Sequence, residues 1–443
     1  MTVGTLRIPM GRHWQSVRRA SHRLSWGVAD QGISSMTNFL LSAFVARTLG
    51  AEQFGAFSLA YVTYGFAINA SRGLAVEPLL IRFSGTSVPT WRRAAAGATG
   101  TALVVGVAGG ILGLATALLF RDTTTGQAFL ALGLTLPGLL LQDCWRYAFF
   151  ALGKGYHAFI NDSVWAAVQI PLLIALKLTG HANVFWFVLA WGASAGAGAV
   201  LGSVQAGVLP SLTASAQWLA RHRDLGPRYL AENTGSNAGD TLRSYTTTSI
   251  LGLTAVGDIQ AANVLLGPFK IILFGVGMIT IPEGAGLLRR SPRKLAPFCA
   301  VVSVGLTVMA LLWAAVLLVA MPHGLGHLML GNLWHAAYPL VLPTTIFTAA
   351  GCAAAGSSLG LHALGAARRS LRVVLLTSLL VIASAVIGAL LWGKAGTLYC
   401  AAAASWAGTV MSWWQLRQAL HESNRAGIVP IWLWPRQVER ARA

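Results

Sequence analysis

The chain has 443 residues, of which 55% are hydrophobic and only 10% are charged. A soluble protein of this length needs far more charged side chains to cover its surface, so the composition excludes a soluble globular fold. Apolar runs long enough to cross a bilayer recur along the chain and predict an all-α polytopic membrane protein. The net charge of +19 is therefore expected to mark a cytoplasmic face, and no nucleic-acid partner is predicted.

Hydropathy predicts about twelve transmembrane helices in two groups of six. The first apolar run follows a basic segment but lacks a small-residue cleavage site, so we expect it to be a retained helix. The predicted spans cover residues 25–46, 56–76, 94–120, 127–152, 157–176, 184–208, 229–252, 259–283, 295–320, 336–360, 374–393 and 396–415. They predict a basic amino-terminal tail (1–24), an N-lobe (25–208), a cytoplasmic linker (209–228), a C-lobe (229–415) and a cytoplasmic tail (416–443).

The distribution of basic residues predicts the orientation of these spans. With the amino terminus in the cytoplasm, 24 of the 32 Lys and Arg residues fall in cytoplasmic tails and loops. The external loops then hold only Arg47, Arg121, Lys177 and Lys394. This bias predicts that both termini lie in the cytoplasm.

Several predicted spans carry polar residues at helical spacing, which places them on one face of each helix. Asp30 and Asn38 share a face of the first span, and Asn69 and Arg72 share a face of the second. Charge at bilayer depth is costly and usually lines a water-filled cavity. Further candidate cavity residues lie in the fourth, fifth, seventh and eighth spans: Asp143, Arg146, Asp162, Gln169, Glu232, Asp240, Arg243, Asn263 and Lys270.

A structural interpretation of these charges stays open beside the functional one. Asp143 and Arg146, and likewise Asp240 and Arg243, stand three residues apart and are spaced for local ion pairs that fix helix packing. Phosphate-loop, dinucleotide and nucleophile-elbow motifs are absent from the sequence, so neither an enzyme nor a cofactor is predicted. His323 and His327 lack an acidic partner nearby, so no metal site is predicted.

Several segments resemble membrane proteins of polysaccharide biosynthesis. The first loop, ARTLGAEQFGAFSLA at residues 46–60, resembles their pattern AR-x-LG-x-x-x-FG, and residues 71–82, 141–154, 161–169 and 266–283 are similar as well. These relatives are Wzx-like flippases of the multidrug/oligosaccharidyl-lipid/polysaccharide exporter (MOP) superfamily. The resemblance implies a MATE-like fold, with two six-helix lobes around a central cavity.

The resemblance also implies an activity. Such a protein moves an undecaprenyl-diphosphate-linked oligosaccharide across the bacterial cytoplasmic membrane by alternating access, with glycosyltransferases, a polymerase and membrane lipid as partners. For that cargo, the cations Arg72, Arg146, Arg243 and Lys270 are expected to hold the diphosphate.

The coupling ion and two other functions stay open. Asp30 and Glu232 begin corresponding polar stripes in the two halves, and carboxylates at such depth are suited to bind a coupling H⁺ or Na⁺. One alternative is a cation-coupled multidrug antiporter of the same fold. The other is a non-transporting membrane scaffold for a glycan-assembly complex.

Overall fold

The computed structural model describes the backbone of residues 10–271, 294–364 and 366–426, and within these ranges the side chains from Ser25 onward except those of residues 236, 237, 367 and 423–426. Within these ranges all regular elements are helical. The elements are α1 (Met10–Thr48), α2 (Ala51–Ser71), η1 (Arg72–Val76), α3 (Glu77–Phe83), α4 (Val88–Leu119), α5 (Thr124–Leu152), α6 (Gly155–Leu178), α7 (Val184–Ala206), α8 (Leu212–Arg221), α9 (Gly226–Leu265), α11 (Leu295–Ala320), η3 (Met321–Leu325), α12 (Gly326–Leu330), η4 (Gly331–Leu333), α13 (Trp334–Ala363) and α14 (Ala367–Ala426).

Two of the longest helices are interrupted by a glycine. Gly252 in α9 has φ 81° and ψ 174°, and Gly393 in α14 has φ 64° and ψ −147°. Only glycine adopts such positive φ values without a steric penalty, so each residue ends one helix and starts another. α9 and α14 therefore each contribute two helices, where the sequence predicts the seventh span and the start of the eighth, and the eleventh and twelfth spans. Residues 272–283 of the predicted eighth span lie outside the described residues.

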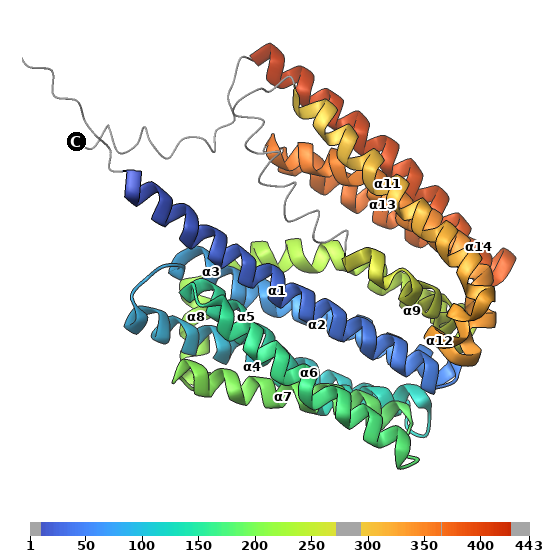
Figure 1. Ribbon diagram of the computed structural model, residues 1–443, viewed down its shortest axis with the longest axis horizontal. Coiled ribbons are helices and arrows are strands. Elements are labelled where there is room, and N and C mark those ends of the chain that lie inside the picture. Colours follow the sequence, from blue (N-terminus) through green and yellow to red (C-terminus); the bar gives the residue numbers. More distant parts are fainter. Residues whose placement is uncertain (1–9, 272–293, 365, 427–443) are drawn as a thin grey trace, which may run out of the picture.

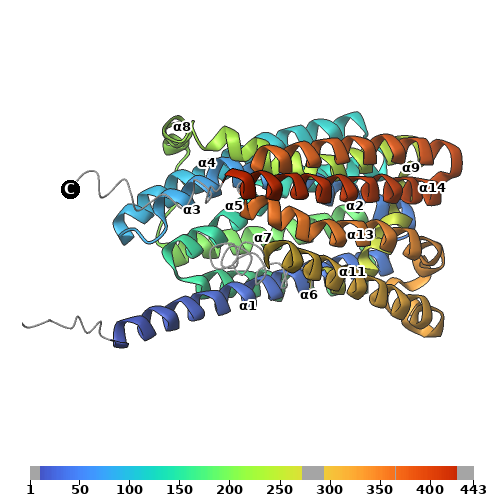
Figure 2. The same ribbon diagram turned by 90° about the horizontal axis from the view of Figure 1, so that it is seen from above.

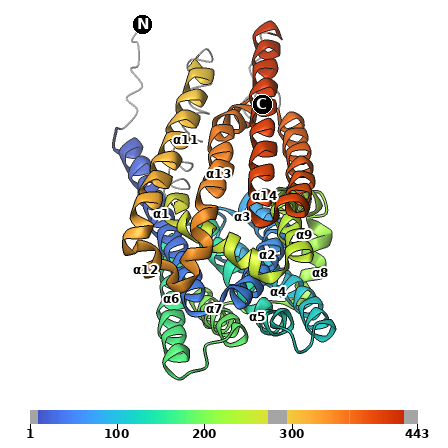
Figure 3. The same cartoon turned by 90° about the vertical axis from the view of Figure 1, so that its right-hand side faces the viewer.

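The helices form two groups that meet along α9. Figure 3 shows α11, α13 and α14 on one side and α2, α4, α5, α6 and α7 on the other. The buried core of the first group contains Trp91, Trp145 and Trp191. Cys299, Leu361 and Leu416 pack together in the second group. Each group thus has a hydrophobic core of its own, and a larger buried cluster around Trp191 continues from the first group into the second.

The surface of the helices is suited to lipid. Six helical stretches in the described ranges are long and apolar enough to cross a bilayer: Val88–Leu119, Thr124–Leu152, Gly155–Leu178, Val184–Ala206, Leu295–Ala363 and Arg368–Glu422. Large side chains such as Leu112, Val204 and Leu390 are exposed on them. Such apolar surface is unfavourable in water and favourable in lipid.

The two groups are in close contact at the end where α1 turns into α2. A Cβ on Gly55 of α2 would collide with the backbone of Leu253, and a Cβ on Gly257 of α9 would collide with the backbone of Ala51. Figure 1 shows the groups diverging from this contact towards the opposite end, where α3 and α8 lie. Figure 2 shows the start of α1 at that same end. The first part of α9 stays packed on the first group, because a Cβ on Gly73 of η1 would collide with the backbone of Leu230. The divergence therefore concerns α11, α13 and α14, whereas α9 follows the first group from end to end.

The helix limits differ from the predicted ones mainly outside the apolar runs. α1 begins at Met10, inside the predicted tail 1–24, because residues 13–26 contain neither Gly nor Pro and the helix continues through them. The predicted linker 209–228 contains α8, whose Trp218 is buried and donates from Nε1 to the Leu74 carbonyl at 3.1 Å. Residues 427–443 of the predicted cytoplasmic tail lie outside the described residues. The limits of the five predicted parts stay a prediction.

Candidate functional site

A buried polar network joins α1, α5 and α6. Arg146 of α5 donates from Nε to Asp30 Oδ2 of α1 at 2.6 Å and from Nη2 to Gln31 Oε1 at 3.0 Å. The same Nε lies 3.4 Å from Asp162 Oδ2 of α6. Asp30 is 0% exposed and Asp162 is 2% exposed. Arg146 therefore ties three helices together inside the protein.

A second arginine of the first half is also held by a carboxylate. Arg72 lies in the π-helical turn η1 and donates from Nε to Asp143 Oδ2 at 2.9 Å and from Nη2 to Asp143 Oδ1 at 2.7 Å. The guanidinium carbons of Arg72 and Arg146 lie 5.0 Å and 5.8 Å from the centre of the Tyr147 ring. The bidentate ion pair between Arg72 and Asp143 is strong and directional.

The local Asp143–Arg146 pair, one of the sequence alternatives, is not among the ion pairs of the described residues. Both side chains lie on α5, yet Asp143 pairs with η1 and Arg146 pairs with α1 and α6. Tertiary partners from neighbouring helices offer better geometry than a residue one turn away on the same helix.

The network holds three carboxylates and two guanidinium groups, so its formal charge is negative when every aspartate is ionised. Two buried carboxylate oxygens, Asp30 Oδ1 and Asp162 Oδ2, have no hydrogen-bond partner among the described residues. Burying an uncompensated charge is costly. One bound proton or monovalent cation would neutralise the network.

Two neutral side chains, Gln142 and Asn161, belong to this network but were not among the predicted site residues. Gln142 donates from Nε2 to Asp162 Oδ1 at 2.7 Å and to Asn161 Oδ1 at 3.1 Å, and Asn161 donates to the Gly198 carbonyl at 2.7 Å. Gln142 and Asn161 stand directly before Asp143 and Asp162 in the chain. That adjacency was the available signal, but consecutive residues do not share a helix face, so it gave no reason to group them.

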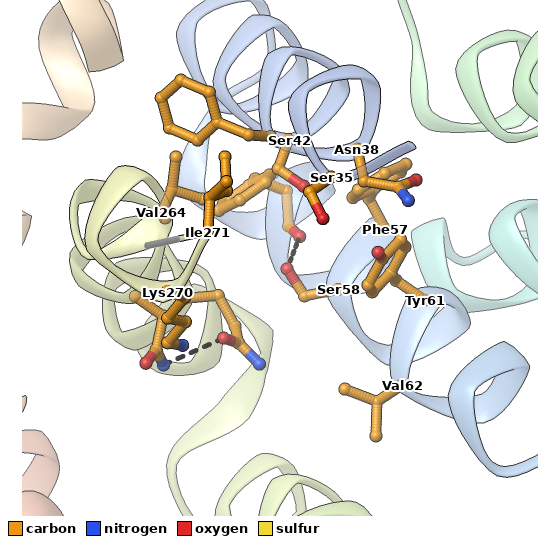
Figure 4. A pocket seen from close by; sticks show the side chains of 15 residues that line it. Ser35, Asn38, Ser42, Phe57, Ser58, Tyr61, Val62, Val264, Lys270 and Ile271 are labelled. Carbon is orange, nitrogen blue, oxygen red and sulfur yellow. Dashed lines mark hydrogen bonds between the residues drawn. The ribbon is translucent and has the colours of Figure 1, made fainter. Parts of the chain in front are cut away.

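A cavity of about 370 Å³ lies between the two groups of helices and is lined by both. Figure 4 shows Lys270 on one wall, across from Ser58 and Tyr61 of α2 and Asn38 of α1. The Lys270 side chain is exposed and forms no ion pair with a carboxylate of the described residues. The cavity is lined by Ser35, Asn38, Phe39, Ser42, Phe54, Phe57, Ser58, Tyr61, Val62, Gln260, Asn263, Val264, Gly267, Lys270 and Ile271.

Arg243 lies on the first part of α9, against α13. Its Nη2 is 3.3 Å from Asp240 Oδ1, so the local pair that the spacing allowed is present. The guanidinium carbon lies 5.0 Å from the centre of the Phe347 ring. The Asp240 side chain is 70% exposed while that of Arg243 is 12% exposed. The carboxylate is thus solvated, and the pair is expected to be weak.

The remaining candidates are dispersed. Asn69 donates to the Gly65 carbonyl of its own helix at 2.7 Å, and Asn263 donates to Gln260 Oε1 at 3.0 Å in the cavity wall. Glu232 is exposed, whereas Asp30 is buried, so the two proposed coupling acids have different surroundings. Gln169 is buried with no partner for either amide atom among the described residues, and it lies away from the central cavity in a groove beside α1.

The four predicted cations therefore occupy three settings. Arg72 and Arg146 are held in the first-half network, Arg243 has a solvated partner, and Lys270 faces the cavity. Asp258 was not among the predicted site residues, yet it is buried and its Oδ2 accepts a hydrogen bond from Lys394 Nζ at 2.6 Å. Asp258 was overlooked because it stands just before the predicted eighth span, where an acid in a loop needs no explanation.

Comparison with known proteins rests on structure alone. No protein-family model matches the sequence, and no curated protein matches it. A solved structure described as the inward-facing conformation of a multidrug-resistance MATE transporter of the MOP superfamily matches with a TM-score of 0.70. The match has 12% identity and covers 89% of this chain and 96% of that chain. The chain has the MATE fold. The predicted all-α architecture, with about twelve membrane helices in two lobes, is thereby confirmed.

Two further MOP-superfamily structures match at lower scores. One is described as an outward-facing MATE multidrug transporter, with a TM-score of 0.57, 13% identity, and coverage of 90% of this chain and 95% of that chain. The other is a MOP transporter from Pyrococcus furiosus described as having a binding pocket of reversed polarity, with a TM-score of 0.57, 13% identity, and coverage of 89% and 94%. At such identities these likenesses establish the fold, while the flippase resemblance remains a sequence-based interpretation.

Proposed function

We propose that this MATE-fold protein is a flippase for an anionic lipid-linked oligosaccharide in the bacterial cytoplasmic membrane. The observation that carries the proposal is Lys270, an exposed cation in a cavity between the lobes that pairs with no carboxylate of the described residues. A lysine ammonium in a cavity attracts a phosphate, and the hydrogen bond between the two groups is charge-assisted and therefore stronger than a neutral one. The undecaprenyl diphosphate of the cargo supplies such a group.

The other walls of the cavity support a sugar-bearing cargo. Hydroxyl and amide side chains of Asn38, Ser58, Tyr61, Gln260 and Asn263 line it, and sugars are bound by such groups. Lys270 would repel an organic cation, so the cavity opposes the cargo of a drug antiporter. The observation that favours the antiporter is the likeness to multidrug MATE structures at 12–13% identity. A scaffold role has no structural observation in its favour.

Coupling is proposed for the network around Arg146. A guanidinium already lies between Asp30 and Asp162, where a coupling cation would otherwise be bound. A proton on one of their two unpartnered oxygens neutralises the network without a separate site. We therefore favour H⁺ over Na⁺.

Both termini are proposed to be cytoplasmic, and a reporter fused at Ala443 would test this orientation. Glycosyltransferases and a polymerase that act on the same lipid are the proposed partners.

The cargo role of Lys270 is tested by substitution. Lys270→Gln should reduce flipping of a lipid-diphosphate sugar in proteoliposomes at least about tenfold, since a charge-assisted hydrogen bond contributes roughly 1.5–3 kcal/mol. Protein abundance should not change, because the lysine is not held by an ion pair with a described carboxylate. Lys270→Arg should retain part of the activity.

The control for this test is Lys154→Gln, which removes an exposed lysine between α5 and α6 and should flip normally. The proposed flippase function would be refuted if Lys270→Gln flipped the lipid-diphosphate sugar at the wild-type rate. It would also be refuted if the wild type exported cationic dyes and flipped no lipid-linked sugar.

The coupling role is tested with Asp30→Asn. The amide oxygen still accepts the Arg146 hydrogen bond, and the neutral side chain imitates a protonated aspartate. We expect folded protein at normal levels with slowed flipping that no longer responds to a pH gradient. Wild-type flipping with a normal response to the gradient would exclude Asp30 from coupling.

A further inference from the structure

A second cavity opens on the membrane-facing side of the molecule, near the end where the two lobes touch. This groove of about 330 Å³ runs between α1 and α6 of the first half and α12 of the second. Leu40, Ile174 and Leu328 in its wall are 44%, 45% and 62% exposed. The groove is lined by Phe39, Leu40, Leu41, Ala43, Phe44, Arg47, Gln169, Ile170, Leu173, Ile174, Leu328 and Met329. Its wall is almost entirely apolar.

The outer end of the groove carries two cations. Arg47 lines it and donates from Nη1 to the Leu328 carbonyl at 2.8 Å, which leaves its other guanidinium donors available. Lys177 Nζ lies 5.6 Å from the centre of the Phe44 ring, which also lines the groove. Both cations are exposed, and neither forms an ion pair with a carboxylate of the described residues.

These two residues are unusual for their side of the membrane. The external loops are predicted to hold only four basic residues, and two of them lie at this groove. A bare apolar groove accepts any lipid tail, but two cations at its outer end add a preference for a negative headgroup. Basic residues at a membrane surface attract anionic lipids through their charge.

We propose that the groove binds an anionic phospholipid of the outer leaflet. One acyl chain lies along Leu40, Leu173 and Ile174, and the phosphate contacts Arg47 and Lys177. The site joins the two halves, because α1 and α6 belong to the first and α12 to the second. A ligand favours the state that it binds better. The bound lipid therefore stabilises the conformation in which the lobes touch at this end.

The test measures lipid retention and involves no transport, so it is independent of the proposed cargo. The full chain is placed in nanodiscs of phosphatidylcholine and phosphatidylglycerol, and lipids retained after extraction are counted by native mass spectrometry. The wild type should keep phosphatidylglycerol in preference to phosphatidylcholine. The double variant Arg47→Gln/Lys177→Gln should bind it about thirty-fold more weakly, from the usual contribution of two basic residues at a membrane surface.

A matched control removes the same charge elsewhere. Arg121→Gln/Lys154→Gln changes two exposed basic residues outside the groove and should retain phosphatidylglycerol like the wild type. Ala43→Phe fills the groove without changing its charge and should also fail to retain phosphatidylglycerol. This variant tests lipid binding independently if the double variant folds poorly. Equal retention by the wild type and Ala43→Phe, equal loss in the control pair, or no preference for phosphatidylglycerol would each overturn the proposal.

Discussion

In the first half of the chain five buried or half-buried charged side chains bind one another, whereas in the second half Lys270 faces a cavity and Arg243 pairs with a solvated acid. Breaking a buried pair leaves an uncompensated charge in the interior, which costs about 3–5 kcal/mol. An exposed pair contributes at most about 1 kcal/mol. The same residue types are thus expected to hold the fold in one half and to remain available for cargo in the other.

The largest effect is expected at Arg146. Arg146→Met should lower the free energy of unfolding by about 3–5 kcal/mol, because Asp30 and Asp162 lose their shared partner inside the protein. Unfolding in mixed micelles under increasing SDS measures the change. Adding Asp30→Asn should restore part of the stability, since it removes one of the unpaired charges.

Arg82→Met is the matched control for that prediction. This substitution breaks the ion pair between Arg82 and Asp224, whose side chains are 37% and 56% exposed respectively. Its cost should stay within about 1 kcal/mol. If Arg146→Met were as stable as Arg82→Met, the contrast between the lobes would be wrong.

A smaller effect is expected at Arg243, and it separates cargo binding from packing. Arg243→Ala and Arg243→Ala/Asp240→Ala should both keep normal abundance, because the Asp240 side chain is 70% exposed and tolerates the loss of its partner. Flipping should fall in both if the cation is needed by the cargo. Immunoblots of membranes and the proteoliposome assay give the two readings. Recovery of abundance and flipping in the double variant alone would make Arg243 a packing residue.

The sequence predicted the helices better than the partners of the charges. Hydropathy located the helices, since it depends on the bilayer rather than on neighbouring helices. The orientation predicted from the bias of basic residues stays a prediction. The pairing of Arg72 with Asp143 and of Arg146 with Asp30 depends on which helices lie side by side, and the spacing of Asp143 and Arg146 pointed to the wrong partner. For Asp240 and Arg243 the spacing along the helix predicted the correct ion pair, because both residues lie on the same helix, three positions apart. The glycine breaks at Gly252 and Gly393 were likewise close to the predicted ends of spans.

The smallest effect concerns α8, which packs on α4 of the first half. His222 follows α8, is 5% exposed, and donates from Nδ1 to the Trp218 carbonyl at 2.8 Å. Burial lowers the pKa of His222 below its usual value near 6.5. The folded state therefore favours the neutral imidazole, so its stability is full above that value and falls as the pH drops towards the lowered pKa.

Hydrogen exchange, corrected for the intrinsic effect of pH, should accordingly show residues 212–225 losing protection between pH 7 and pH 5. His222→Gln should remove this dependence, because its amide can still donate to the carbonyl but does not titrate. His362→Gln changes an exposed histidine of α13 in the second half and should leave the pH response of α8 unaltered. If the wild type and His222→Gln lost protection equally, the acid sensitivity of the first half would have to arise from its buried aspartates instead. Protection that did not change with pH in the wild type would show that docking of α8 does not depend on a neutral His222.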